Sequence, residues 1–409
     1  MSYLSKLLPD ETNRAMWKTE LLGRIADTTS GGTPDKKHPE YYKNGNILWV
    51  RSGELDKGII YDTEIKITET GLQNSSAKVF PAGTLLIALY GATIGKLAFL
   101  GKPASTNQAV CAIFQNDTVS LRYLYYYLLF FRPELIKQGI GGAQPNISQT
   151  ILKKLPVHYP ASLDEQERIV ARIEELFSQL DSGVETLRKT KQQLAVYRQA
   201  VLKEAFAGFT DYTTLASIST RIFDGPFGTN LKTADYVSSG IRVVRLENIK
   251  NGWFDDSKQS FVTEEKYESI KQHTVYPSDL IMSTFMADNI KICQLPAHIP
   301  FAVNKADCIG IRLRDDFLPK FVMLFLLQRE VYQRVAVDIH GATRPRVNTK
   351  QIKAIPIPKA GFELQNAIVS SVEEKLSLCD SIENTVDMSL HQAEAMRQSI
   401  LKQAFEGDI

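Results

Sequence analysis

The chain has 409 residues, of which 44% are hydrophobic and 23% are charged, and its formal net charge is +2 at pH 7. This composition is typical of folded globular proteins and excludes a disordered or fibrous class. The length predicts two or more domains, because a single hydrophobic core rarely extends over so many residues. The small net charge gives only weak support for nucleic-acid binding, so contacts with phosphates must come from local basic patches.

Cysteine usage and the short apolar runs predict a soluble, cytoplasmic protein. The four cysteines are scattered without a Cys-x-x-Cys pair, which favours a reduced, intracellular protein without structural zinc. Residues 1–14 lack the apolar run of a secretory signal. The richest apolar run, Tyr123 to Phe131, has nine residues, whereas about 20 are needed to cross a bilayer.

Residues 1–160 are expected to form a mixed α/β domain. Short runs of Val, Ile, Leu and aromatic residues, bounded by Gly, Pro, Asn and Asp, predict its strands. These runs are Ile47 to Val50, Thr84 to Leu89 and Val110 to Phe114. The apolar segment Tyr123 to Leu129 predicts a helix, and a proline-flanked extended segment ends the domain at Pro160.

Residues 161–208 are expected to form one long helix. Apolar residues recur at alternating spacings of four and three from Ile169 to Val201, and eight of the ten positions in this seam are apolar. A 3.5-residue repeat over about four heptads predicts a helix that packs on a partner helix. Ser162 and Glu165 predict a capping box at its start, and Gly208 stands where a C-cap glycine belongs.

The second half of the chain repeats the first, which indicates an internal duplication of about 200 residues. Residues 209–360 predict a second mixed α/β domain, and residues 361–409 predict a second long helix with the same heptad spacing. The predicted seams include Tyr197 in the first helix and Ile382 and Met396 in the second. Matched positions are Trp49-Val50-Arg51 with Val243-Val244-Arg245, Asn107 with Asn304, and Cys111 with Cys308.

These elements predict an α+β fold with two mixed α/β domains separated by two long antiparallel coiled-coil helices, related by a pseudo-two-fold axis. At 1.5 Å per residue, a helix of about 43 residues is roughly 65 Å long. Two related domains held at a fixed separation are suited to reading two half-sites on a DNA duplex. A dimerisation or scaffold rod explains the helix pattern equally well.

Short motifs, in the same order in both halves, resemble the specificity subunits of type I restriction-modification systems, and the resemblance covers nearly the whole chain. The second half departs from the pattern at Met286-Ala-Asp-Asn289 and at Gly341-Ala-Thr-Arg-Pro-Arg346. The motifs of the first half are Ser30-Gly-Gly-Thr-Pro34, Ile47-Leu-Trp-Val-Arg51, Ile67-Thr-Glu-Thr-Gly-Leu72, Phe80-Pro-Ala-Gly-Thr-Leu85, Gly91-Ala-Thr-Ile-Gly95, Asn107-Gln108, Gly142-Ala-Gln-Pro-Asn-Ile147, Leu155-Pro156 and Gln166.

The resemblance implies a subunit of a host-defence system whose two target-recognition domains read different halves of a bipartite, asymmetric DNA site. It implies assembly with two methyltransferase subunits, which modify adenine in DNA, and with two restriction and translocase subunits. S-adenosylmethionine, ATP and Mg²⁺ would belong to those partners. The resemblance therefore implies that this chain is non-catalytic, holds no cofactor or metal, and has no membrane partner.

Candidate DNA contacts follow from side-chain chemistry. Arg51 and Arg245 end matched strands and can reach phosphate or a guanine edge, although a structural ion pair is the alternative. The loops at Gly32, Thr33 and Lys36 and at Gly228, Thr229, Asn230 and Lys232 are expected to offer backbone N–H groups and lysines to phosphates, or to be ordinary turns. The remaining candidates are the guanidinium groups of Arg344 and Arg346, the amides of Gln144 and Asn146, and Tyr90 and Thr93.

Patterns that imitate catalytic motifs are rejected. The segment Gly91 to Lys96 is one residue short of the Walker spacing, and Leu97 stands where a magnesium-binding hydroxyl is needed. Asp35 with Glu64 and Lys66 imitates a nuclease metal site, but the second half supplies no matching acid. The remaining alternatives are a coiled-coil scaffold without a DNA role and a single-chain DNA-modifying enzyme with an unrecognised site.

Overall fold

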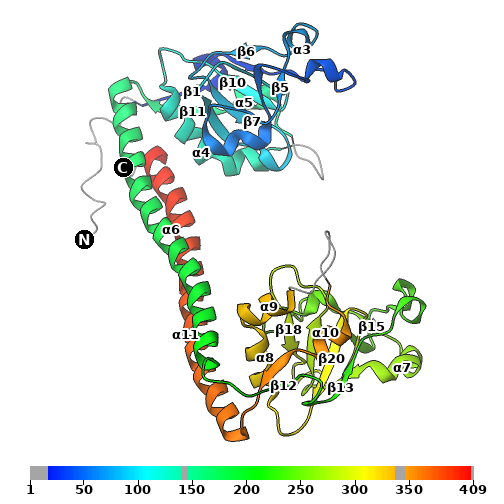
Figure 1. Cartoon of the computed structure of the whole chain (residues 1–409). Coiled ribbons are helices and arrows are strands. Elements are labelled where there is room, and N and C mark those ends of the chain that lie inside the picture. The colour runs from blue at the N-terminus through cyan, green and yellow to red at the C-terminus, as the bar shows by residue number, and fades with distance from the viewer. Residues whose placement is uncertain (1–16, 140–145, 337–345, 407–409) are drawn as a thin grey trace, which may run out of the picture. The chain divides into compact units, whose positions relative to one another are not determined.

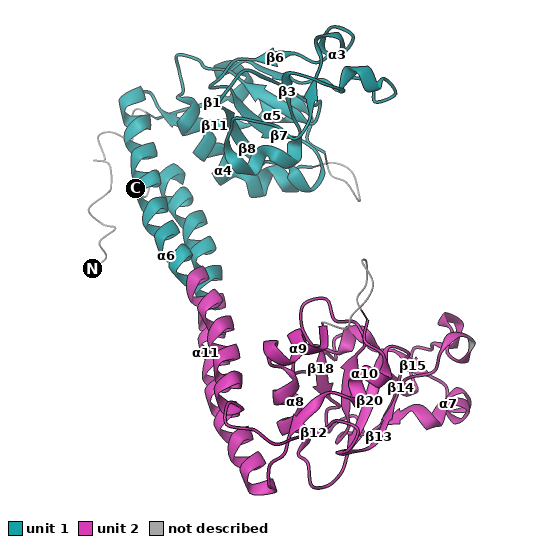
Figure 2. Cartoon of the chain, viewed as in Figure 1, with its two compact units in different colours: residues 1–187, 388–409 teal, residues 188–387 magenta. Residues whose placement is uncertain are grey.

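The computed structural model describes residues 17–139, 146–336 and 346–406 of the chain (Figure 1). The chain divides into two compact units, with Met1–Leu187 and Met388–Ile409 in unit 1 and Arg188–Asp387 in unit 2 (Figure 2). Each unit therefore contains one mixed α/β globular part and a portion of each of the two long helices. In the described part of the chain, no helix combines the length and apolar character required to span a membrane.

The globular part of unit 1 is built on a five-stranded sheet in the order β2-β10-β7-β8-β4 and a four-stranded sheet in the order β5-β3-β9-β6. The pairs β4/β8 and β3/β9 are parallel, and a separate antiparallel pair joins β1 to β11. The strands are β1 Trp17–Leu21, β2 Thr28–Ser30, β3 Ile47–Val50, β4 Gly58–Ile60, β5 Lys66–Ile67, β6 Val79–Phe80, β7 Leu85–Ala88, β8 Leu97–Leu100, β9 Ala104–Thr106, β10 Val110–Ile113 and β11 Pro156–Pro160. The helices and 3-10 turns are α2 Leu22–Ile25, η2 Pro39–Tyr41, η3 Ser52–Lys57, α3 Glu69–Gln73, η4 Gly91–Thr93, α4 Leu121–Lys137, α5 Gln149–Lys153 and the long α6 Leu163–Ala205.

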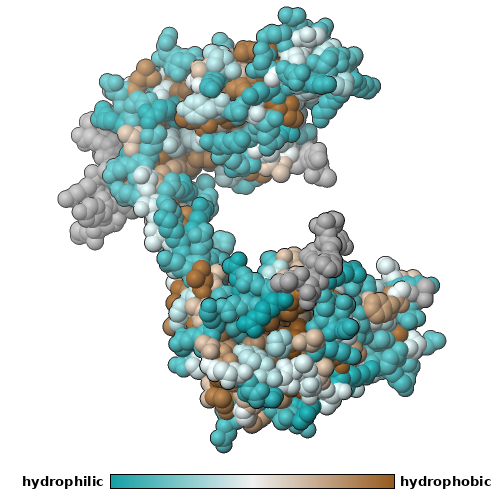
Figure 3. Space-filling view, viewed as in Figure 1, coloured by the Kyte–Doolittle hydropathy of each residue, from teal (hydrophilic) through white to brown (hydrophobic). Residues whose placement is uncertain are grey.

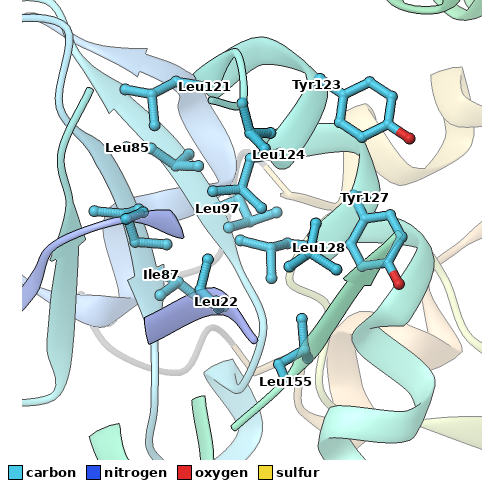
Figure 4. Close-up of a cluster of buried hydrophobic side chains, with 14 of the residues drawn as sticks. Leu22, Leu85, Ile87, Leu97, Leu121, Tyr123, Leu124, Tyr127, Leu128 and Leu155 are labelled. Atoms are coloured by element: carbon cyan, nitrogen blue, oxygen red, sulfur yellow. The ribbon is translucent and has the colours of Figure 1, made fainter. Parts of the chain in front are cut away.

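Strand β7, in the middle of the five-stranded sheet, consists of buried apolar residues throughout. Successive side chains of a strand point to opposite faces. Leu85 and Ile87 enter the core under helix α4, where Leu124 and other residues surround them (Figure 4). Leu86 and Ala88 enter a second core on the other face. Because both faces are covered, the strand is a continuous apolar run rather than an alternating one.

Unit 2 has a four-stranded sheet in the order β13-β20-β17-β18, a second one in the order β15-β14-β19-β16, and the antiparallel pair β12/β21. Its pair β14/β19 is parallel. The strands are β12 Tyr212–Thr214, β13 Ser219–Phe223, β14 Ile241–Val244, β15 Phe261–Val262, β16 Thr274–Val275, β17 Leu280–Ser283, β18 Ile292–Gln294, β19 Ala302–Asn304, β20 Cys308–Leu313 and β21 Pro356–Pro358. The helices and 3-10 turns are η5 Gly228–Asn230, η6 Thr233–Asp235, η7 Leu246–Asn248, α7 Glu264–Ile270, η8 Lys271–His273, α8 Pro319–Leu326, α9 Arg329–Ala336, α10 Thr349–Lys353 and the long α11 Phe362–Glu406.

Backbone hydrogen bonds correct one detail of the predicted match between the halves. In unit 1 the Asn107 N–H donates to the carbonyl oxygen of Val50 over 2.9 Å, and in unit 2 the Lys305 N–H donates to that of Val244 over 2.9 Å. Since Val50 and Val244 were matched, the counterpart of Asn107 is Lys305. The predicted pairs Asn107 with Asn304 and Cys111 with Cys308 are therefore wrong by one residue.

The two long helices pack antiparallel within each unit. In unit 2, Lys191 of α6 donates to Asp387 of α11 over 2.7 Å, and Arg198 donates to Asp380 over 2.6 Å, so residue numbers rise along α6 as they fall along α11. In unit 1, the Arg397 guanidinium of α11 forms an ion pair with Asp181 of α6 and lies 4.9 Å from the ring centre of Phe177 on α6. Charged pairs thus flank the apolar seam in both units, as in other paired helices.

The apolar seam is narrower than the heptad pattern predicted. Seam positions such as Ile173, Val201 and Val372 are buried. Tyr197, Ile382 and Met396 are exposed, so their predicted place in the seam is wrong. A two-helix contact covers only a narrow stripe of each helix, and side chains at the edge of the stripe remain in solvent.

A buried glutamine ties each long helix to the globular part of its own unit. In unit 1 the Gln166 side chain accepts the Ser120 N–H over 2.8 Å and donates to the carbonyl oxygens of Thr118 and Pro160. In unit 2 the Gln365 side chain accepts the Leu318 N–H over 2.8 Å and donates to the carbonyl oxygens of Asp316 and Ala360. Both glutamines are fully buried. We call these two arrangements the glutamine clamps.

Candidate nucleic-acid interface

Unit 1 contains a pocket of about 650 Å³ at the ends of several of its strands and turns. Thr33 and Lys36 reach it from the loop after β2, and Arg51 reaches it from the end of β3. Tyr90 and Asn107 reach it from the segments that follow β7 and β9. The fold therefore brings four predicted DNA contacts, Thr33, Lys36, Arg51 and Tyr90, to one place, which we call the unit 1 pocket.

Arg51 is held at the unit 1 pocket by two carboxylates. Its backbone N–H donates to the buried side chain of Glu54 over 2.9 Å, which fixes the turn after β3. Its guanidinium forms an ion pair with Glu64. The ion pair expected as the alternative to DNA contact is thus present in the free protein. Both partners remain accessible, since the Arg51 side chain is 38% exposed and that of Glu64 is 68% exposed.

Replacing Glu64 with glutamine is expected to strengthen DNA binding about two- to fivefold, because an exposed ion pair contributes about 0.2–1 kcal/mol and the change frees Arg51 for phosphate. Fluorescence anisotropy over a range of salt concentrations measures the effect. Asp62→Asn is the matched control, since Asp62 pairs with Lys66 over 3.0 Å outside the pocket lining. An unchanged affinity for Glu64→Gln, or an equal gain for Asp62→Asn, would contradict the expectation.

Tyr90 lies at the edge of the unit 1 pocket and has an exposed ring. Its backbone pairs with that of Asn146, which places the exposed Asn146 beside it. The Thr93 hydroxyl donates to the Tyr90 carbonyl oxygen over 2.7 Å, so this hydroxyl stabilises the turn. Tyr42, another lining residue, donates its hydroxyl proton to the Pro34 carbonyl, and burial raises the pKa of this phenol. Gln144 lies outside the described residues.

The backbone N–H of Gly32 is not directed at phosphate, contrary to the prediction. This glycine is buried, and its N–H donates to the Thr106 carbonyl oxygen over 2.9 Å. Its own carbonyl accepts the Trp49 indole N–H over 3.0 Å. A β-carbon at this position would lie 2.3 Å from the backbone of Ser76 and Ala77. Gly32 is therefore required for close packing, and the expectation that its backbone N–H is free to bind phosphate is wrong.

The corresponding loop of unit 2 is more exposed. Gly228 has φ +57° in a turn where a β-carbon would meet nothing within 4 Å, so it stands in solvent. The Asn230 N–H donates to the Phe227 carbonyl oxygen over 3.1 Å, and the Lys232 N–H donates to Asp235 over 2.6 Å. The Asn230 and Lys232 side chains are exposed and available to phosphate. The side chain of Thr229 lies outside the described part of the chain.

Cations and aromatic rings gather beside this loop in unit 2. The Arg245 guanidinium lies 5.5 Å, and the Lys305 ammonium 5.7 Å, from the ring centre of Tyr236. The sequence did not point to Lys305, because its counterpart Asn107 was matched one residue away. With the alignment of the two halves corrected by one residue, Lys305 follows β19 as Asn107 follows β9, and the sequence then points to this lysine.

Arg346 forms a second basic position in unit 2. Its guanidinium lies 4.2 Å from the ring centre of Phe285 and 3.4 Å from the Asp307 carboxylate. Its backbone pairs with that of Phe285, just as Asn146 pairs with Tyr90 in unit 1. The stacked, half-exposed guanidinium can still bind a base edge or phosphate. Arg344 lies outside the described residues.

The described residues contain no group of three or more His, Cys, Asp or Glu that could hold a metal ion. Most of the surface visible in Figure 3 is hydrophilic, with smaller hydrophobic patches on both units. The chemistry offered by the two sites consists of guanidinium and ammonium groups, amides and aromatic faces. These groups bind phosphates, base edges and base faces.

Residues 15–194 match the family model of the type I restriction modification DNA specificity domain. The resemblance to type I specificity subunits that the motifs indicated is thereby confirmed. The EcoR124I/EcoR124II specificity subunit of Escherichia coli is 27% identical over 190 residues, which are 45% of this chain and 46% of that subunit. The MjaIX specificity subunit of Methanocaldococcus jannaschii is 25% identical and covers 84% of this chain and 83% of its own length.

A solved chain from a study of complex assembly and conformational transition of the type I R-M system has the same fold. It superimposes with a TM-score of 0.75 at 16% identity, and the match covers 98% of this chain and 99% of the solved one. The expected mixed α/β fold with long helices is therefore confirmed.

Proposed function

We propose that this chain is the DNA specificity subunit of a type I restriction-modification complex and is itself non-catalytic. Its two mixed α/β parts, residues 1–160 and 209–360, act as target-recognition domains for the two halves of a bipartite, asymmetric site. The observation that carries the proposal is that each unit gathers arginine, lysine and aromatic side chains where β3 or β14 ends. The specificity-domain match over residues 15–194 supports the same conclusion.

An internal duplication accounts for the two recognition domains. The orders β2-β10-β7-β8 and β5-β3-β9-β6 of unit 1 correspond strand for strand to β13-β20-β17-β18 and β15-β14-β19-β16 of unit 2. The glutamine clamps support the duplication, since Gln166 and Gln365 bind the same kinds of backbone groups. The different polar groups at the two sites fit domains that read different sequences.

The two long helices, residues 161–208 and 361–409, serve in this proposal as the spacer between the recognition domains. Their lengths of 43 and 45 residues and their antiparallel packing within each unit support this role. The number of base pairs between the two half-sites would follow from helix length, because half-site spacing mirrors protein spacing.

The partners in this proposal are double-stranded DNA, two methyltransferase subunits and two restriction and translocase subunits. S-adenosylmethionine, ATP and Mg²⁺ belong to those partner subunits, and this chain holds none of them. The names of the related proteins support the assignment, since each is the specificity subunit of a type I restriction enzyme. Phosphate contacts make DNA affinity fall steeply with salt.

Arg51→Ala and Arg346→Ala are expected to weaken recognition of different half-sites, each by about 5- to 100-fold, since a specific side-chain contact to a base contributes about 1–3 kcal/mol. The complex is reconstituted with its methyltransferase subunit, and methylated adenines are mapped in randomised DNA. Arg168→Ala, an exposed arginine on α6 paired with Glu165, controls for the loss of charge. Unchanged half-sites in both variants would contradict the proposal, as would methyl transfer or cleavage by the purified chain alone.

A further inference from the structure

We propose that the unit 1 pocket receives one unstacked base of the recognition duplex, so that this half-site is read partly outside the base stack. The inference rests on the proposed function of the chain in DNA recognition. It deepens that function by assigning a nucleotide to one described cavity.

The shape and walls of the pocket fit a base better than a base edge. Its volume of about 650 Å³ is within the roughly 300–1,000 Å³ of sites that enclose small molecules. Tyr42, Trp49 and Tyr90 line it, of which Tyr90 is exposed, Tyr42 is partly exposed and Trp49 is buried. Aromatic walls bind the faces of bases by stacking. In a stacked duplex only base edges are accessible in the grooves, so a base must leave the stack to offer its face.

Hydrogen-bonding groups without partners are present in the same pocket. The Asn107 side-chain oxygen and the Arg51 Nε–H are buried and have no hydrogen-bond partner. Because the Asn107 oxygen has no partner, a ligand that donates a hydrogen bond to it displaces no existing bond. An amide can bind the edge of a base through one donor and one acceptor. The exposed Gln108 adds a second amide at the pocket.

The charges at the pocket fit the phosphates that flank an extruded nucleotide. Lys36 is exposed and, in the part of the chain that the structure describes, has no ion-pair partner. Arg51 offers a second cation whose carboxylate partners, Glu54 and Glu64, lie outside the pocket lining. Cationic side chains position the backbone of a nucleic acid through its phosphates. The pocket thus has aromatic rings for the face of a base, amides for its edge and cations for the flanking phosphates.

The corresponding site of unit 2 carries different side chains from the unit 1 pocket. Lys305 takes the place of Asn107, and its ammonium group and the Arg245 guanidinium both lie within 6 Å of the Tyr236 ring centre. Tyr236 directly follows the turn η6 as Tyr42 directly follows η2, so two cations lie beside the ring that corresponds to Tyr42. We expect unit 2 to contact a stacked duplex and to extrude no base.

A mismatch scan tests the inference with the full chain and its recognition duplex, obtained from the methylation map. The methyltransferase subunit is left out, because methyltransferases themselves extrude bases. Each base pair of both half-sites is mismatched in turn by changing one strand and then the other, and affinity is measured by anisotropy. At one position of the half-site read by unit 1, a mismatch made by changing the strand opposite the extruded base is expected to strengthen binding at least threefold. The mismatched base is no longer paired, so binding does not have to break a base pair.

A fluorescent probe and two variants complete the test. Placed next to the extruded position, 2-aminopurine is expected to brighten on binding, because its stacking neighbour is removed. Asn107→Ala is expected to weaken binding of the matched duplex at least tenfold and to abolish the mismatch preference. Arg346→Ala, in unit 2, is expected to weaken binding while the preference remains.

Mismatches that weaken binding at every position, with specific binding of the matched duplex intact, would overturn the extruded base and leave DNA recognition standing. A mismatch preference that survives Asn107→Ala would also overturn it. Absence of any sequence-specific binding by the chain or its complex would overturn both proposals.

Discussion

Gln166→Leu is expected to lower the free energy of unfolding of unit 1 by about 1–3 kcal/mol. The Gln166 side chain serves three backbone groups, the buried carbonyl oxygen of Pro160 and the partly buried Ser120 N–H and Thr118 carbonyl oxygen. Leucine fills a similar volume but bonds none of them, and each buried polar group left without a partner costs about 1–3 kcal/mol. Because the side chain is fully buried, no bulk water replaces the lost bonds.

Hydrogen exchange locates this effect more sharply than global unfolding, since a chain of two units need not unfold in one step. The Ser120 amide and the first turn of α6 are expected to exchange faster in Gln166→Leu, while Leu318 in unit 2 keeps its protection. Gln179→Leu, an exposed glutamine on the same helix, is the matched control and should stay within about 0.5 kcal/mol of the parent. Equal protection of Ser120 in both variants would refute the role of the clamp.

Inserting one heptad into each long helix is expected to lengthen the spacer of the recognised DNA site by about three base pairs. Seven residues add about 10.5 Å to a helix, and consecutive base pairs are about 3.4 Å apart. The insertions fall after Leu187 in α6 and after Asp387 in α11, where the two compact units divide. Whole heptads keep the apolar seam in phase, whereas four residues would shift it.

Methylation mapping of the reconstituted complex measures the spacer. Both half-sites should remain unchanged, since neither recognition domain is altered. Replacing residues Gly183 to Lys189 by a heptad of the same length provides the control and should leave the spacer unchanged. An unaltered spacer with the insertions, or altered half-sites with an unchanged spacer, would contradict the spacer role of the helices.

Periodicity predicted the parts of the fold that depend on local sequence. The long helix expected within residues 161–208 is observed at Leu163–Ala205, and the runs at Ile47 to Val50 and Val110 to Phe114 contain β3 and β10. Both signals arise from burial of a regular face. The exposed Tyr197 and Met396 show the limit, since heptad spacing does not tell how wide a stripe the partner helix covers.

The candidate sites were predictable only in part, because they depend on contacts distant in sequence. Matched strand ends pointed to Arg51 and Arg245, but nothing in the local pattern paired Arg51 with Glu64. Lys305 was missed because the loops of the two halves differ in length, which hides a one-residue shift in the alignment of the halves. The backbone hydrogen bonds show this shift. Gly32 looked like a loop glycine although its N–H is bonded inside the fold.

The glutamine clamps bear on how the two globular parts can vary in sequence. Every group that Gln166 or Gln365 bonds belongs to the backbone, as with the N–H groups of Ser120 and Leu318 and the carbonyl oxygens of Pro160 and Ala360. Backbone groups are present whatever side chain a position carries. The attachment of each domain to its helix therefore tolerates wide divergence in the domain, provided that the path of the main chain is kept. If the globular parts recognise DNA as proposed, their side chains can change while the backbone contacts of the glutamine clamps are kept.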